Sequence, residues 1–162
     1  MGLFSNIMHK PAVRTQMLES VAGGLKEANR KRQTNQITAD GSDHNVFVAP
    51  WSGYVEELYI ASPAATTSTS SNSVTVTVDN ITQSTTLVSF DTFVNGVELL
   101  ANKGIKVDFN FGISGGRVLS QYNAGDLIAI SVTINGTLSG LSSSSVFSIN
   151  TAFTPNDKKV TI

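Results

Sequence analysis

The side chains that could do chemistry in this 162-residue chain are few and scattered. The two histidines, His9 and His44, have no second ligand at a spacing such as His-x-His that would hold a metal ion. Glu56 and Glu57 are adjacent carboxylates, but neighbouring residues of a strand point to opposite faces, so we expect no acid–base pair from them. Ser114 lies in Gly112-Ile-Ser-Gly-Gly116, whose letters match the Gly-x-Ser-x-Gly pattern of a hydrolase nucleophile, but we interpret this Gly-rich run as a turn that no helix follows. There is no cysteine. The sequence therefore predicts no enzyme, no catalytic residue, no metal site and no cofactor.

Charge is divided unevenly along the chain. The first 36 residues carry six Lys or Arg against two Glu, whereas the remainder carries five against ten Asp or Glu. Such asymmetry indicates two parts that meet different partners. The basic segment could contact phosphates, but its one aromatic residue, Phe4, offers little for stacking bases, so we expect an acidic protein surface rather than nucleic acid. No apolar run approaches the roughly 18 residues that span a bilayer, and no signal peptide is evident, so no membrane partner is expected.

An N-terminal arm is predicted over residues 1–45, with a helix from Ala12 to Arg32 and a polar linker from Gln33 to Asn45. Apolar residues recur at helical spacing, although Gly23-Gly24 interrupts them at a cost of ~1 kcal/mol each. So short a helix needs a surface to lie on. That surface is either its own β domain or another subunit, and we favour the second. The predicted partner-binding residues of the arm are Val13, Arg14, Met17, Val21, Leu25, Lys26, Arg30, Lys31 and Arg32.

Residues 46–162 read as a run of short strands. In Ser73–Val78, valines alternate with threonines, and turn signals such as Asn95-Gly96 and Asn135-Gly136 separate the runs. This spacing predicts an all-β fold, an antiparallel jelly-roll-like β-sandwich preceded by the helical arm. We expect the β domain to associate with copies of itself through faces rich in Ser, Thr and Val. The strands are expected at residues 46–49, 54–60, 73–78, 85–90, 105–111, 118–122, 127–134, 146–153 and 159–162.

Aromatic residues gather at the opening of the predicted sandwich: Phe47, Trp51, Tyr54 and Tyr59. Packing in the core and at its edges is the interpretation we favour. The alternative is that Trp51 and Tyr59 face a ligand and stack on a sugar, since aromatic rings expose large flat apolar surfaces.

Two segments of the chain form a recognisable pair: Val-Phe-Val-Ala-Pro-Trp-Ser-Gly-Tyr-Val at 46–55 and Asn-Ala-Gly-Asp-Leu-Ile-Ala-Ile at 123–130. This pair resembles a group of tailed-bacteriophage virion proteins of the capsid decoration or cement (head fibre-base) type. In that group the first pattern opens a small all-β domain and the second begins a later strand, and the resemblance covers roughly residues 46–134. The first string also looks like the start of biotinyl or lipoyl carrier domains, but Lys103 and Lys106 lack the flanking residues of a carrier lysine.

The phage resemblance implies a structural virion protein that binds and stabilises a capsid, with the arm contacting neighbouring subunits. The implied partners are the major capsid protein or other virion subunits, together with copies of this chain, with a trimer favoured. The implied location is the capsid exterior, after assembly in the host cytoplasm. The alternative is a receptor- or glycan-binding module of a head or tail fibre, anchored by the arm.

Overall fold

Alternating β-branched residues set the strands in the computed structural model, which describes residues 31–40, 45–107 and 121–156. In one strand, Ser73–Asn80, all three valines are buried while Thr75 and Thr77 reach the surface. Successive side chains of a strand point to opposite faces, and β-branched residues pack well on a pleated surface. One face of such a strand therefore belongs to a core and the other to solvent.

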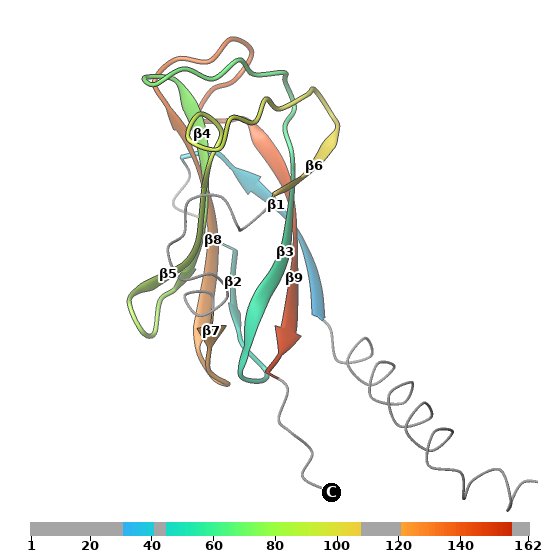
Figure 1. Ribbon diagram of the computed structural model, residues 1–162, viewed down its shortest axis with the longest axis vertical. Coiled ribbons are helices and arrows are strands. Elements are labelled where there is room, and N and C mark those ends of the chain that lie inside the picture. Colours follow the sequence, from blue (N-terminus) through green and yellow to red (C-terminus); the bar gives the residue numbers. More distant parts are fainter. Residues whose placement is uncertain (1–30, 41–44, 108–120, 157–162) are drawn as a thin grey trace, which may run out of the picture. The chain divides into compact units, whose positions relative to one another are not determined.

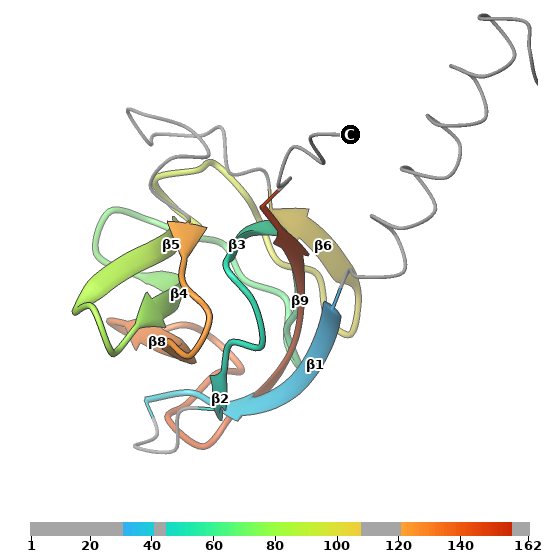
Figure 2. The same ribbon diagram turned by 90° about the horizontal axis from the view of Figure 1, so that it is seen from below.

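The described residues form two antiparallel sheets. One has the strand order β1-β9-β3-β6, with the short β7 also pairing with β3, and the other has the order β2-β8-β4-β5. Figure 1 shows the two sheets side by side, and Figure 2 shows them from one end as separate layers. The strands are β1 (Lys31–Thr38), β2 (Asn45–Val48), β3 (Gly53–Ala61), β4 (Ser73–Asn80), β5 (Thr85–Asp91), β6 (Gly104–Val107), β7 (Gln121–Tyr122), β8 (Leu127–Asn135) and β9 (Val146–Pro155).

The strand pairing is nested around the β4–β5 hairpin. Outward from that hairpin, β3 pairs with β6, β2 with β8 and β1 with β9, so each pair encloses the previous one. From β1 to β4 the chain alternates between the two sheets, and Lys31 lies opposite Phe153. The pairing confirms the predicted all-β, antiparallel architecture.

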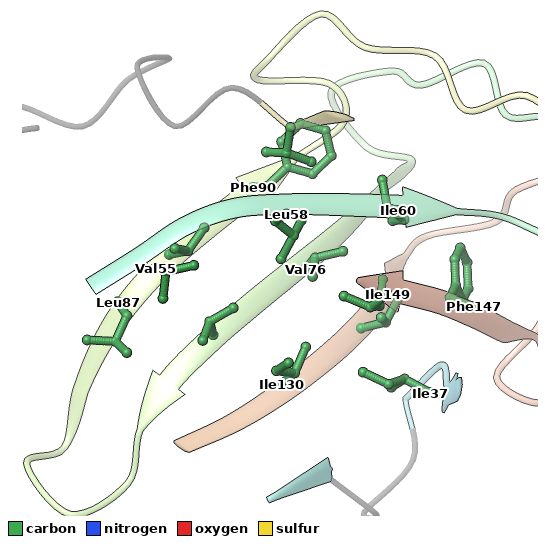
Figure 3. Close-up of a cluster of buried hydrophobic side chains, with 14 of the residues drawn as sticks. Ile37, Val55, Leu58, Ile60, Val76, Leu87, Phe90, Ile130, Phe147 and Ile149 are labelled. Carbon is green, nitrogen blue, oxygen red and sulfur yellow. The ribbon is translucent and has the colours of Figure 1, made fainter. Parts of the chain in front are cut away.

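The two sheets share one hydrophobic core. Figure 3 shows side chains of β3 and β9 directed toward those of β4, β5 and β8. Burying a side chain of this size fully contributes about 1.5–3 kcal/mol. The largest fully buried side chains include Ile37, Leu58, Ile60, Leu87, Ile128, Ile130, Phe147, Ile149 and Phe153.

The first strand corrects the predicted domain boundary. Lys31–Thr38 forms β1 and pairs along its whole length with β9, so the predicted linker holds a strand and the compact β unit starts at Lys31 rather than Val46. The expected helix cannot extend through Lys31 and Arg32. The strand was missed because it lies at a sheet edge and Ile37 is its one large apolar residue, so no alternating pattern marks it.

The other predicted strands are confirmed where the structure describes them, with ends that differ by one or two residues. The predicted strand from Ile105 is described to Val107, and the one ending at Tyr122 is described from Gln121. The arm up to Arg30, the remainder of those two strands and the predicted strand 159–162 lie outside the described residues.

Candidate functional site

The two segments that carry the phage resemblance meet at one end of the sandwich. β2 pairs with the start of β8, and beyond β2 the backbone N–H of Ala49 donates to the carbonyl of Asp126 (2.8 Å). In return Gly125 N–H donates to the carbonyl of Ala49 (2.8 Å), and Ala124 N–H donates to Ser52 Oγ (3.0 Å). We call this junction the Asp126 corner.

The carboxylate of Asp126 ties this corner together. Its Oδ2 accepts hydrogen bonds from Asn80 Nδ2 (2.6 Å), Gln83 Nε2 (2.6 Å) and the backbone N–H of Asn123 (2.7 Å). Asp126 is 6% exposed and Asn80 is fully buried. A buried carboxylate is tolerated only with such donors. These donors come from the β4–β5 hairpin and the β7–β8 turn, so the carboxylate holds the two segments against each other.

An aromatic cluster fills the core beside the corner. The ring of Phe153 lies edge-on to Phe47, with centroids 4.7 Å apart, and edge-on to Tyr122 at 5.8 Å. Burial raises the pKa of Tyr122 to about 12, and the neighbouring Trp51 side chain opposes this rise. Trp51 is half-buried and packs against the same core.

The two predicted ligand-facing aromatics do not form one surface. Tyr59 is half-buried on the outer face of β3, where Lys106 Nζ lies 6.0 Å from its ring centroid. Trp51 precedes β3 at the corner. About 20 Å of strand lies between the start of β3 and Tyr59, at roughly 3.3 Å per residue. A single sugar ring could not stack on both.

A β-bulge changes the expected position of the adjacent glutamates. The register of β3 with β9 shifts between Val55 and Glu57, which leaves Glu56 as the extra residue. Val55 and Leu58 are both buried, and both glutamates between them reach the outer face. The expectation that their side chains point to opposite faces is therefore wrong. Glu56 Oε2 accepts a hydrogen bond from Thr154 Oγ1 (2.6 Å), and Glu57 Oε1 forms an ion pair with Lys106 Nζ (3.0 Å).

A second carboxylate, Asp91, organises the opposite end of the β4–β5 pair. Its Oδ2 accepts from Ser73 Oγ (2.7 Å) and Thr75 Oγ1 (2.8 Å), and its Oδ1 from the backbone N–H groups of Phe93 (2.9 Å) and Val94 (3.0 Å). Partial burial acts to raise the pKa of Asp91, but these hydrogen bonds together lower it below its ordinary value. We call residues 91–97 the Asp91 turn.

Hydroxyl groups cover the outer face of the sheet between these two carboxylates. Thr77 Oγ1 and Ser131 Oγ are hydrogen-bonded across β4 and β8 (2.7 Å). Asp79 accepts from Thr77 Oγ1 at Oδ2 (2.7 Å) and from Thr86 Oγ1 at Oδ1 (2.7 Å). The face is polar, and its hydroxyls and carboxylates are linked to one another across the strands.

The structure describes only some of the predicted partner-binding residues of the arm, those from Lys31 onward. Val13 to Arg30 lie outside the described residues, whereas Lys31 and Arg32 belong to β1, opposite Phe153 and Ala152 of β9. Sequence reasoning missed the roles of both aspartates. Asp126 was visible only within the Asn-Ala-Gly-Asp stretch at 123–126, and no pattern singled out Asp91, because the side-chain donors of both lie far away in the sequence.

Across residues 31–40, 45–107 and 121–156, no group of three His, Cys, Asp or Glu side chains is placed to hold a metal ion. No helix within those same ranges is long and apolar enough to cross a membrane.

Comparison with known proteins gives little. No protein-family model matches the chain, and no curated protein matches it. Among solved structures, a chain from "Structure of infectious bursal disease virus Gt strain" is similar, with a TM-score of 0.31 and 14% sequence identity. The similarity covers 78% of this chain but 31% of that one, so this chain spans under a third of its length. A TM-score this low does not show that the two chains share a fold. The architecture of this chain is established by its own strand pairing.

Proposed function

We propose that the chain is a non-enzymatic structural protein of a virion, which binds and stabilises a bacteriophage capsid from its exterior. The observation that carries the proposal is the nested pairing in the sheets β1-β9-β3-β6 and β2-β8-β4-β5. We infer from it a jelly roll, a double sheet of eight strands made from two Greek keys. Viral capsid domains, lectins and cupins all use jelly rolls, so the fold supports a virion role by analogy alone.

The surface chemistry supports assembly into a larger particle. Only 14% of the residues are charged, and the outer face of β4, β5 and β8 is covered by hydrogen-bonded hydroxyls. A solitary soluble domain more often carries about twice that density of mixed charge. A surface of this kind can be buried against other subunits without leaving many desolvated charges.

In the proposed mechanism, the basic arm attaches the β domain to the shell. Its apolar stripe, which includes Met17, Val21 and Leu25, lies on an adjacent capsid subunit, while Arg14 and Lys26 pair with acidic groups there. Each such contact is small, but many symmetric copies on one particle add up to strong avidity. We propose further that the protein is a homo-oligomer, with a trimer favoured.

The test mixes full-length protein with shells of the parent virus that lack it and measures co-sedimentation. Two double variants are compared in the full-length chain. The stripe variant carries Met17→Asp and Val21→Asp. The off-stripe control carries Gln16→Asp and Ser20→Asp, so it adds the same charge at the same spacing one position away. A deletion should stop at residue 30, because β1 starts at Lys31.

We expect the wild-type protein and the off-stripe variant to bind the shells equally well. The stripe variant should bind at least about tenfold more weakly, which corresponds to the loss of one modest apolar contact. Equal binding by both variants would refute the role of the arm. Failure of the wild-type protein to bind any shell would refute the function.

The second candidate function is glycan or receptor binding by a fibre module. The position of Tyr59 beside Lys106 on an outer face favours it, because an accessible ring with a nearby polar group suits a sugar. A glycan array with wild-type protein and Tyr59→Ala tests this. Trp51→Ala is a poorer probe, since Trp51 packs against the core and its loss would destabilise the fold.

A further inference from the structure

The outer face of the sheet β1-β9-β3-β6, the layer labelled β1, β9 and β6 in Figure 2, carries a row of side chains that crosses all four strands. The strand register places Asn150 opposite both Thr34 and Tyr59, and it places Tyr59 opposite Lys106. A Cβ atom added at Gly104 would meet nothing within 4 Å. The ring of Tyr59 therefore borders a low and open part of this face. The neighbouring row consists of small residues: Ser148, Ala61 and Gly104.

The β-bulge in β3 brings two carboxylates to the same face, next to Tyr59. Glu56 is the extra residue of the bulge and joins Glu57 on the outer face, whereas in a regular strand one of the two would point into the core. Bulges are frequent beside functional sites, where they redirect a side chain. A carboxylate offers about four acceptor positions, so each can accept from a ligand as well as from its protein partner.

Asn150 adds an acceptor that no described residue satisfies. Its Nδ2 donates to Thr34 Oγ1 of β1 (2.9 Å), so its Oδ1 lies on the other side, toward β3 and Tyr59. This Oδ1 is buried and accepts no hydrogen bond from any described residue. A buried acceptor of this kind costs free energy until a donor reaches it. A ligand hydroxyl at the edge of the Tyr59 ring would supply that donor, directly or through one water.

We propose that Tyr59, Asn150, Glu56, Glu57 and Lys106 form a binding site for a neutral sugar, which we call the Tyr59 platform. The aromatic ring stacks on the apolar C–H face of the sugar, and the sugar hydroxyls donate to the carboxylate and amide oxygens around it. Hydrogen bonds to carboxylates are the stronger kind. The inference rests on the second candidate function and deepens it by naming the class of ligand and its contacts.

The charge of the Tyr59 platform selects against acidic sugars. Among its described side chains, the carboxylates of Glu56 and Glu57 outnumber the one ammonium group, which belongs to Lys106 and forms an ion pair with Glu57. Like charges brought together at a binding surface suppress the wrong partner. A neutral hexose or N-acetylhexosamine supplies hydroxyl donors without adding a negative charge, so it fits this acceptor-rich site.

The test applies the full-length chain to a glycan array that carries neutral hexose and N-acetylhexosamine oligosaccharides beside sialylated and sulfated glycans. Tyr59→Ala removes the ring, Tyr59→Phe keeps the ring without its hydroxyl, and Glu57→Gln removes one carboxylate. Phe93→Ala is the matched control, because it removes a ring that is 46% exposed in the Asp91 turn, beyond β5 of the other sheet. Thermal unfolding of each variant checks that the fold is retained.

We expect the wild-type protein to bind neutral glycans and to leave the acidic ones unbound. Tyr59→Phe and Phe93→Ala should bind as the wild-type protein does. Tyr59→Ala should bind at least about tenfold more weakly, and Glu57→Gln about three- to tenfold more weakly, because its amide accepts through one uncharged oxygen. In an NMR titration with the best neutral glycan, the side-chain amide signal of Asn150 should shift.

Binding confined to acidic glycans, or neutral-glycan binding that folded Tyr59→Ala retains, would overturn the Tyr59 platform and leave glycan binding as a function. An equal loss in Phe93→Ala would overturn it too. Should Tyr59→Ala fail to fold, unchanged binding by Glu57→Gln together with an unshifted Asn150 signal would be decisive against the site. A folded wild-type protein that binds no glycan refutes both the site and the second candidate function. Shell binding is measured separately, so a protein that binds glycans but no shells refutes the capsid function alone.

Discussion

Asp91 and Asp126 lie at opposite ends of β4, and each gathers donors from segments distant in the sequence. Asp126 is almost fully buried, and its Oδ2 accepts from Asn80, Gln83 and the backbone of Asn123. Asp91 is half-buried, and half of its donors are backbone N–H groups of the Asp91 turn itself. A carboxylate thus anchors the fold where it is deeply buried, at Asp126, and shapes a surface turn where it is only half-buried, at Asp91.

The largest expected effect is at the buried end. Asp126→Ala leaves the buried amide of Asn80 and the N–H of Asn123 without their acceptor, so we expect a loss of about 3 kcal/mol in the free energy of unfolding. Chemical denaturation measures it. Glu98→Ala removes an exposed carboxylate and should change stability by less than about 0.5 kcal/mol. Equal effects of the two variants would contradict the anchoring role.

Alkaline pH should also lower the free energy of unfolding, through Tyr122 beside the Asp126 corner. The pKa of Tyr122 is about 12 in the folded protein and 10.0 ordinarily, so its stabilising contribution is complete below pH 10 and is lost as the pH rises toward 12. Two pKa units correspond to about 2–3 kcal/mol. Tyr122→Phe keeps the ring contact with Phe153 and should flatten this part of the profile. An unchanged alkaline loss in that variant would assign the effect to another group.

A smaller effect is expected at the exposed end. The pKa of Asp91 is lowered in the folded state, so its contribution is present at neutral pH and is lost as the pH falls below 3.8 toward the native value. With solvent screening, Asp91→Asn should cost about 1 kcal/mol at pH 7 and reduce the acid-dependent loss. Urea unfolding at pH 7 and at low pH measures both. The rate of amide hydrogen exchange should rise at Phe93 and Val94 in this variant. Unchanged protection there would show that the Asp91 carboxylate does not order the turn.

The smallest effect concerns the outer face of β3. The side chain of Lys106 is 54% exposed and that of Glu57 is 17% exposed, so water reaches their ion pair from the lysine side. A double-mutant cycle with Lys106→Met and Glu57→Gln should give a coupling of less than about 0.5 kcal/mol. A coupling above 2 kcal/mol would mean that this face is as constrained as the Asp126 corner.

Much of the fold was predictable from residue pattern. The valines of β4 and the isoleucines of β8 alternate cleanly, because each strand has one face in the core. β1 was not predictable, since its inward positions include the polar Asn35 beside Ile37. The bulge at Glu56 was equally invisible, because it arises from the register with β9 rather than from the local residues.

The candidate sites were less predictable than the strands. The sequence marked Asp126 within the stretch 123–130 but did not mark Asp91. Their donors come from other elements, such as Asn80 for Asp126 and Ser73 for Asp91. Val48 and Leu127 become neighbours only through the pairing of β2 with β8. Contacts set by topology cannot be derived from periodicity along one strand.

One measurement tests the central claim most directly: a cryo-EM map of the parent particle, into which the two-sheet domain is fitted. The account predicts density for this domain at symmetry-related positions on the shell exterior, with the segment before Lys31 running onto an adjacent capsid subunit. A shell that lacks this density, or density confined to the tip of a fibre, would contradict it.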